Sequence, residues 1–376
     1  MNIEARGHFG LRTTPGISCV HVTVTAGGQY IEPMEKERRA VMADVAREAG
    51  VSVMTVSRVL SGYPGVSDRT RSRVERSVAA LDYRANPAAR VLAGGRSRTL
   101  GVVALESDQF GPTHTLFGIE AAARAANHAL SFVTLRRLDA PELRSTLARL
   151  RDQHVEGVVV IAPLRGIADA IAEIDNDLPV VLVGGDPAVA TSTVTIDQYQ
   201  GARLATEHLL DIGHSAVHHV TGPPTWIDSA ERKRGWEDAL RHHGCIVVPA
   251  IGGDWSAASG YEAGKLLGRD PNVTAVFAAN DQTAMGLLLA LHECGRSVPD
   301  DVSVVGFDDT PESGFFRPPL TTVRQSFGEV GDRCVQLLLS KIDDDARQST
   351  HITIEPQLIV RASSGPPQGR LSSSVL

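Results

Sequence analysis

Residues 44–60, DVAREAGVSVMTVSRVL, decide how the N-terminal part of this chain folds. The stretch predicts two short helices joined by a tight turn at Gly50, where a positive φ costs little. Ala46 and Ala49 are small enough for a second helix to cross close by. Ser52 is a candidate N-cap for that second helix. The pattern therefore predicts a helix-turn-helix.

The second predicted helix, residues 53–60, has two chemically different faces. One is apolar and is expected to be buried. The other combines two apolar side chains, a hydroxyl and a guanidinium, which suits poorly a surface that meets only water. These groups match the thymine methyls, phosphates and guanine edges of a DNA major groove. The face expected to be buried consists of Val56, Val59 and Leu60, and the exposed face of Val53, Met54, Ser57 and Arg58.

A third helix is predicted at residues 66–81, with Ser67 as its cap. Residues 83–95, YRANPAARVLAGG, then predict one more short helix, because Pro87 suits a first helical turn and two glycines end the segment. A helix of about two turns is too short to be stable alone in water. We therefore expect it to fold only against a partner.

These motifs resemble the LacI/GalR family of bacterial transcriptional repressors. The resemblance rests on DVAREAGVSVMTVSRVL, VSDRTRSRVE and LDYRANPAARVLAGGRS, and extends to about residue 361. It implies that the short helix is a hinge, that two hinges of a dimer enter the minor groove, and that Leu92 wedges between base pairs. The helix face and the resemblance together predict contacts to double-stranded, palindromic operator DNA at Ser52, Val53, Met54, Thr55, Ser57, Arg58, Thr70, Asn86, Ala89 and Leu92.

Composition and charge agree with a basic head on an acidic body. The 376 residues suffice for two or three domains, and 42% of them are hydrophobic. The chain carries a net charge of −7, yet residues 35–98 hold 13 Lys or Arg against 7 Asp or Glu. This asymmetry favours a DNA-binding module joined to a different domain. No uninterrupted apolar run reaches the ~18 residues of a membrane span, and we expect a cytoplasmic protein.

The sequence favours a binding protein over an enzyme. Its four cysteines are scattered without C-x-x-C spacing, and two His-His pairs have no third ligand at metal spacing. There is also no G-x-S-x-G motif and no P-loop. We expect no catalytic residues, no metal and no cofactor.

From residue 99 the pattern changes to alternating strands and helices. Short apolar runs such as LGVVAL, VEGVVVIA and VSVVGFDD alternate with amphipathic helices such as GARLATEHLLDIG. This pattern is typical of parallel sheets covered on both faces, an α/β fold. There are too many strands for one comfortable sheet, so we expect two doubly wound lobes. The resemblance implies the same two-lobed, periplasmic-binding-protein-like body, with ligands bound at the strand ends.

The residues after several strands suit a sugar. A carboxylate and an amide can take hydroxyls, a guanidinium can donate a fork, and an indole can cover the apolar face of a ring. The resemblance places effector contacts at Thr113, Arg232, Trp255, Asn280, Asp308, Gln325 and Phe327, and favours a galactoside or related sugar. It departs at Gly184, where an aspartate is expected, so the sugar contact there is in doubt. We expect Asp281 and Asp309 to cap turns and helices instead.

We place a disordered leader at 1–40, with residues 1–33 outside the native fold, and the helix-turn-helix domain with its hinge at 41–95. The effector-binding body then spans 96–361, with one lobe at about 99–196 plus 327–354 and the other at about 197–324 plus 355–361. Residues 362–376, rich in Ser, Gly and Pro, are expected to be a disordered tail. They lack leucine heptads, so we expect a homodimer. The alternatives are a sugar-transport protein and a regulator that responds to a purine or a phosphoprotein.

Overall fold

The computed structural model describes residues 40–60, 63–83, 96–137, 139–164, 166–167, 171, 178–185, 191–344 and 348–368. Two compact units divide the chain near residue 89. The predicted leader up to residue 39 and the predicted hinge helix, including Asn86, Ala89 and Leu92, lie outside the described residues.

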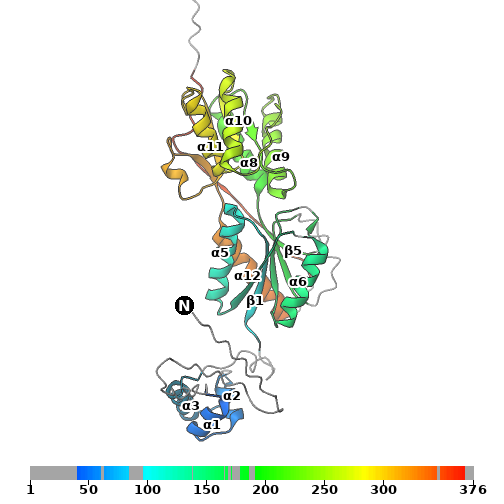
Figure 1. Ribbon diagram of the computed structural model, residues 1–376, viewed down its shortest axis with the longest axis vertical. Helices are drawn as coiled ribbons and strands as arrows, with labels where there is room; N and C mark the ends of the chain where they lie inside the picture. The colour runs from blue at the N-terminus through cyan, green and yellow to red at the C-terminus, as the bar shows by residue number, and fades with distance from the viewer. Residues whose placement is uncertain are drawn as a thin grey trace, which may run out of the picture. The chain divides into compact units, whose positions relative to one another are not determined.

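The N-terminal unit is the predicted helix-turn-helix with a third helix (Figure 1). Gly50 ends the first helix with φ 59°, the left-handed conformation expected of the turn. Buried side chains from all three helices form one small core that includes Val45, Val56 and Val74. Burial of Val56 fixes which face of the second helix is exposed. The helices are α1 (Met42–Ala49), α2 (Val53–Leu60) and α3 (Asp68–Ala80).

The first lobe of the body contains a six-stranded parallel sheet in the order β10-β5-β4-β3-β1-β2. Alternate side chains of β1 serve opposite faces: Val102 packs with α5 and α12, and Val103 packs with α6 (Figure 1). The elements are β1 (Thr99–Leu105), α5 (Phe110–Ala125), β2 (Ala129–Leu135), α6 (Ala140–Asp152), β3 (Val158–Ile161), β4 (Val180–Val183), β5 (Ser192–Ile196), α12 (Phe327–Asp344) and β10 (His351–Ile354).

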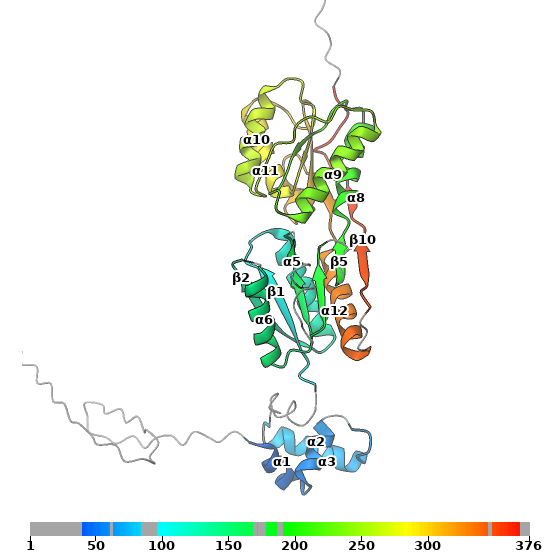
Figure 2. The ribbon, with the colours of Figure 1, turned by 90° about the vertical axis from the view of Figure 1, so that its right-hand side faces the viewer.

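The second lobe contains a five-stranded sheet in the order β11-β9-β8-β7-β6, in which only the edge strand β11 runs antiparallel. Helices α8 and α9 cover one face, and α10 and α11 cover the other (Figure 2). The elements are α8 (Gln198–Asp211), β6 (His218–Val220), α9 (Ile227–His242), α10 (Ala257–Arg269), β7 (Ala275–Ala278), α11 (Asp281–Glu293), β8 (Ser303–Asp308), β9 (Thr321–Arg324) and β11 (Gln357–Ile359).

The chain passes between the two lobes after β5, after β9 and after β10. The lobes also meet directly, because the backbone N–H of Ile227 donates to the carbonyl of Pro163 at 2.9 Å. The prediction of two doubly wound lobes is therefore confirmed. Because parallel strands end at the same edge, these passages bring the strand ends of both sheets to one cleft.

The beginning of the predicted disordered tail is ordered, which corrects the sequence prediction. Ser363 is fully buried, its hydroxyl donates to the carbonyl of Val304 at 2.6 Å, and it accepts from the backbone N–H of Thr321 at 2.7 Å. Gly365 adds a bond to the hydroxyl of Ser303 at 3.0 Å. Small polar side chains can thus hold a segment against a sheet without an apolar pattern. Among the described residues, no helix could cross a membrane and no acidic, His or Cys cluster could hold a metal.

Candidate functional site

Helix α2 presents its predicted face at the surface of the N-terminal unit. Val53 is 46% exposed and Met54 63% exposed, while Ser57 is partly buried. Ser52 is the N-cap, since its hydroxyl accepts from the backbone N–H of Thr55 at 3.1 Å and lies 2.9 Å from the Thr55 hydroxyl. Exposed apolar side chains beside hydroxyls at the start of a helix suit insertion into a major groove.

Two arginines contact Tyr63, which follows the end of α2. The guanidinium of Arg58 is exposed and lies 5.5 Å from the ring centroid of Tyr63. Arg71, on α3, donates to the carbonyl of Tyr63 at 2.9 Å. Thr70 lies at the start of α3 and accepts from the hydroxyl of Ser67 at 3.0 Å. These contacts orient the loop that follows the recognition face.

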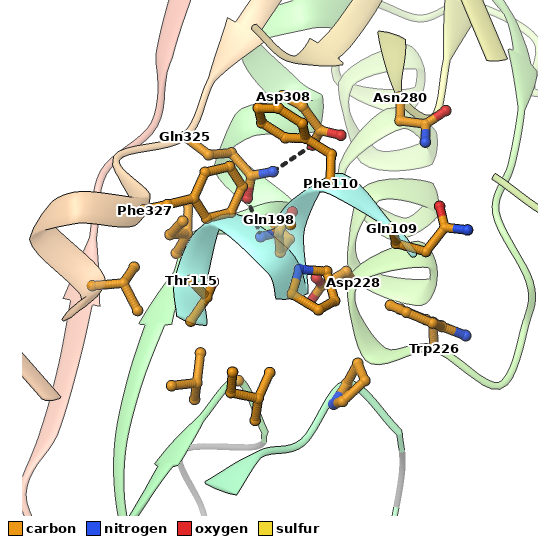
Figure 3. Close-up of a pocket in the computed structure, with 18 of the residues that line it drawn as sticks. Gln109, Phe110, Thr115, Gln198, Trp226, Asp228, Asn280, Asp308, Gln325 and Phe327 are labelled. Carbon is orange, nitrogen blue, oxygen red and sulfur yellow. Dashed lines mark hydrogen bonds between the residues drawn. The ribbon is translucent and has the colours of Figure 1, made fainter. Parts of the chain in front are cut away.

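The second candidate site is the cleft between the lobes of the body, whose empty space, counted together with open solvent at its mouth, is about 690 Å³ (Figure 3). Six of the seven predicted effector residues line it, namely Arg232, Trp255, Asn280, Asp308, Gln325 and Phe327. Thr113 does not; α5 contributes Gln109, Phe110 and Thr115 instead. Helix α5 begins at Phe110 and includes Thr113, whose role as an effector contact stays a prediction.

Four buried polar side chains that line this cleft form a closed ring. Arg232 Nε donates to Gln198 Oε1 at 2.8 Å, and Gln198 Nε2 donates to Gln325 Oε1 at 2.8 Å. Gln325 Nε2 donates to Asp308 Oδ1 at 2.5 Å (Figure 3), and Arg232 Nη2 lies 3.6 Å from the same oxygen. Each of the four is at most 7% exposed. Hydrogen-bonded networks of this kind hold side chains in one orientation.

Burial dominates the electrostatics of the ring. It raises the pKa of the Asp308 carboxyl to about 6, although Arg232 and the Gln325 amide pull that pKa down. Burial likewise lowers the pKa of Arg232, against the attraction of Asp308 and other carboxylates. The guanidinium also lies over the ring of Phe307, 3.7 Å from its centroid. The ring therefore contains an ion pair, Asp308 with Arg232, and the surrounding hydrogen bonds only partly compensate the cost of burying its charges.

Aromatic side chains supply apolar walls. Trp255, in the left-handed region at φ 72°, lies so close to Gly222 that a Cβ there would meet its ring at 2.4 Å. Trp226 packs edge-on against Trp255, with 5.7 Å between ring centroids. Across the cleft, Phe110 and Phe327 pack edge-on at 5.8 Å. The buried Nε1 of Trp255 has no hydrogen-bond partner among the described residues.

Asn280 is partly committed to the fold. Its Oδ1 accepts from the backbone N–H of Thr283 at 2.9 Å and caps α11, and its Nδ2 donates to the Trp255 carbonyl at 3.1 Å. The neighbouring Asp281 accepts from Thr322 and Thr310, and burial raises its pKa to about 7. Asp281 therefore ties strands to a helix.

Asp309 also serves the fold. It accepts from Arg324 and Arg361, both at 2.6 Å, and these bonds lower its pKa despite burial. Neither aspartate lines the cleft, as expected, but the predicted capping role is corrected: Asn280 caps α11, and Asp309 forms ion pairs with two arginines.

Several cleft residues escaped the sequence reasoning, namely Gln109, Phe110, Thr115, Gln198, Trp226 and Asp228. Gln198 follows the helix cap Asp197, whose side chain accepts from Gln200. Asp228 lies in the first turn of α9, four residues before Arg232. That i,i+4 spacing was the signal that could have found it, since both side chains share a helix face. Gly184 lines the cleft where an aspartate was expected.

Comparisons with known proteins match both units. Residues 41–86 match the model of bacterial regulatory proteins of the lacI family, and residues 206–364 match the periplasmic binding protein-like domain. The lactose operon repressor of Klebsiella pneumoniae is 32% identical over 331 residues, which cover 88% of this chain and 93% of that protein. The chain belongs to the lacI family. Its members are DNA-binding transcriptional regulators, so the family prediction from sequence is confirmed.

Other relatives place the chain among regulators with different effectors. The transcriptional regulator CelR of Thermobifida fusca is 33% identical over 344 residues, covering 88% of this chain and all of the relative. A lac repressor dimer solved with operator and the anti-inducer ONPF matches with a TM-score of 0.81 and 30% identity, over 87% of this chain and all of that one. A CelR–cellobiose complex matches with a TM-score of 0.64 and 31% identity, with the same coverage.

Proposed function

We propose that this lacI-family protein is a cytoplasmic, homodimeric repressor that binds a palindromic operator. A sugar that binds reversibly, and that the protein does not chemically change, releases it from the operator. The observation that carries the proposal is the cleft, where a buried Asp308–Arg232 pair faces aromatic walls. A carboxylate accepts from two adjacent hydroxyls, a guanidinium donates to a third, and aromatic rings cover C–H faces.

Exposed apolar side chains support the homodimer. Leu266 on α10 and Met285 and Leu289 on α11 are each 46–60% exposed, on helices that pack against each other. Apolar groups gathered at a surface favour association. Light scattering at micromolar concentration is expected to give a dimer, and a stable tetramer or monomer contradicts this part of the proposal.

The effector acts through differential affinity. A sugar that binds the DNA-released arrangement of the lobes more tightly weakens operator binding by that difference alone, typically about 1–3 kcal/mol. By the same linkage, the operator weakens sugar binding equally. The relevant measurement is therefore a pair of affinities, each determined with and without the other ligand.

The test begins with operator selection from random palindromic duplexes, followed by gel shifts with lactose, cellobiose, hypoxanthine or guanine added separately. Release by a disaccharide, with matching isothermal titration, supports the proposal. Release or tightening by a purine base alone moves the protein to the purine-responsive class. Failure to select any duplex while a sugar binds favours a transport function.

A further inference from the structure

We infer that the cleft accepts only uncharged effectors, and that Asp228 is the residue that rejects phosphorylated or carboxylated sugars. This inference rests on the proposed function and names the ligand class of the same site. Among the described residues that line the cleft, the ionisable groups are Asp228, Arg232 and Asp308. Two carboxyls therefore face one guanidinium, and with both ionised the formal charge of the lining is −1.

The single cation is already committed to the protein. Arg232 Nε donates to Gln198, one Nη donates to the Ala279 carbonyl, and the other Nη faces Asp308. One face of the guanidinium is covered by the ring of Phe307. Bidentate binding of a phosphate or carboxylate needs two parallel N–H groups in one plane. What remains of the Arg232 fork suits a hydroxyl.

Asp228 is placed to meet a ligand. It lies on the same face of α9 as Arg232, is half-buried and lines the cleft (Figure 3). No hydrogen bond or ion pair within the described residues holds its carboxyl, whereas Asp308 is held by Gln325 and Arg232. A carboxyl oxygen in this position can accept from a sugar hydroxyl. An anionic group beside it would meet like charge in a medium of low dielectric.

Helix dipoles do not offset this charge. Helices α8, α9, α11 and α12 begin at the cleft, and helix N-termini attract anions. Each of the four already has its own carboxyl: Asp197 caps α8, and Asp228, Asp281 and Glu329 lie in the first turns of α9, α11 and α12. Helix α5 has no acidic residue in its first turn. An anion could use that one helix end, and the experiment below addresses it.

The simple alternative is that Asp228 only complements the dipole of α9, as acidic residues in first turns commonly do. That role predicts a stability effect and no effect on ligand choice. Burial raises the pKa of Asp228, with Arg232 acting in the opposite direction. Even when protonated, Asp228 adds no positive charge, so the lining then has a formal charge of zero and still offers an anion no free cation.

The test uses the full-length protein and matched pairs of ligands: lactose with lactose 6-phosphate, and cellobiose with cellobiose 6-phosphate. Isothermal titration compares the wild type with Asp228→Asn, Asp228→Glu and Asp238→Asn. Asp238 lies on the same helix outside the cleft lining, where it accepts from Arg241, and controls for the loss of one negative charge. Operator binding by each variant shows that it is folded.

We expect the wild type to bind a neutral disaccharide at least 100-fold more tightly than its 6-phosphate. In Asp228→Asn, the ratio of the two affinities is expected to fall at least tenfold. Asp228→Glu should keep the wild-type ratio, and so should the control Asp238→Asn. Equal or tighter binding of a 6-phosphate by the wild type overturns the inference and leaves the sugar-responsive repressor standing. Undiminished preference in Asp228→Asn overturns the role of Asp228. If neither neutral sugars nor phosphates bind or release operator, the proposed function itself fails.

Discussion

Replacing Asp308 with asparagine is expected to separate effector binding from folding. The substitution keeps the shape of the side chain and one acceptor for Gln325, but removes the charge and the second acceptor oxygen. Hydrogen bonds to charged groups contribute about 1.5–3 kcal/mol. At about 1.4 kcal/mol per factor of ten, sugar affinity should fall roughly 10- to 150-fold. Operator binding without sugar should be unchanged.

The free energy of unfolding, in contrast to sugar affinity, should increase in Asp308→Asn. Burial raises the pKa of Asp308 from 3.8 to about 6, so the folded protein favours the protonated carboxyl. At about 1.4 kcal/mol per pH unit, the ionised carboxylate costs about 3 kcal/mol above pH 6. The stability that the folded protein has with a protonated Asp308 is fully present below pH 3.8 and is lost as the pH rises through 6. Because asparagine resembles the protonated acid, Asp308→Asn should be more stable than the wild type at pH 8, by up to about 3 kcal/mol.

Urea unfolding at pH 5 and pH 8 measures this difference, and Asp309→Asn is the matched control. Asp309 lies next in the chain, yet bonds from Arg324 and Arg361 lower its pKa. Its replacement should therefore destabilise the protein to a similar extent at pH 5 and pH 8, because both values lie above 3.8, where this stabilisation is fully present. An Asp308→Asn protein that still responds fully to sugar would place the effector elsewhere. Loss of operator binding together with stability would show that Asp308 is structural and refute the reasoning.

The remaining predictions address the other parts of the molecule. Met54→Ala and Arg58→Ala should each weaken specific operator binding, with roughly 1–3 kcal/mol of discrimination lost for a bidentate arginine–guanine pair; gel shifts on operator and scrambled duplexes decide, and unchanged preference would refute the helix assignment. Leu92→Ala, outside the described residues, should lower operator affinity and DNA bending, and an unchanged bend angle speaks against a wedge. Gln198→Leu breaks two bonds of the polar ring and should reduce operator release by sugar at least fivefold while sugar still binds; a full response in gel shifts sinks this prediction. Sugar affinity by titration should fall as pH drops from 8 to 5 through the pKa of Asp308, about 6, and equal affinity at both values would count against its carboxylate as an acceptor.

The helix-turn-helix could be predicted almost to the residue because its signals are local. The turn glycine, the cap Ser52 and the apolar spacing all act within a few residues, and α2 spans Val53–Leu60 as expected. The major strands were also predictable, since fully buried parallel strands are continuous apolar runs. Strands β9, β10 and β11 were not, because they are short and carry exposed polar residues such as Arg324. They are strands because a neighbouring strand pairs with them.

Most of the cleft residues that escaped prediction lie at the start of a helix; Thr115, which lies inside α5, is the exception. Gln198, Asp228 and Gln109 occupy positions where polar residues normally satisfy helix ends, so their sequence context has an ordinary explanation. Only the packing of two lobes reveals that these helix ends meet. The aromatic Phe110 was equally ambiguous, since a single phenylalanine at a helix start more often packs into a core.

The polar ring joins the candidate effector site to two of the passages between the lobes. Gln198 stands immediately after the passage from β5, and Gln325 immediately after β9. The bond between their amides pins these passages together, and the other two members of the ring are the charged groups that a sugar would engage. A hydroxyl that competes for Asp308 thus competes with Gln325 directly. Because the carboxylate is only partly compensated, a ligand that supplies the missing hydrogen bonds gains from doing so. Under the proposed function, effector binding and lobe arrangement would depend on the same few bonds, and the buried ion pair would make the fold responsive at a cost in stability.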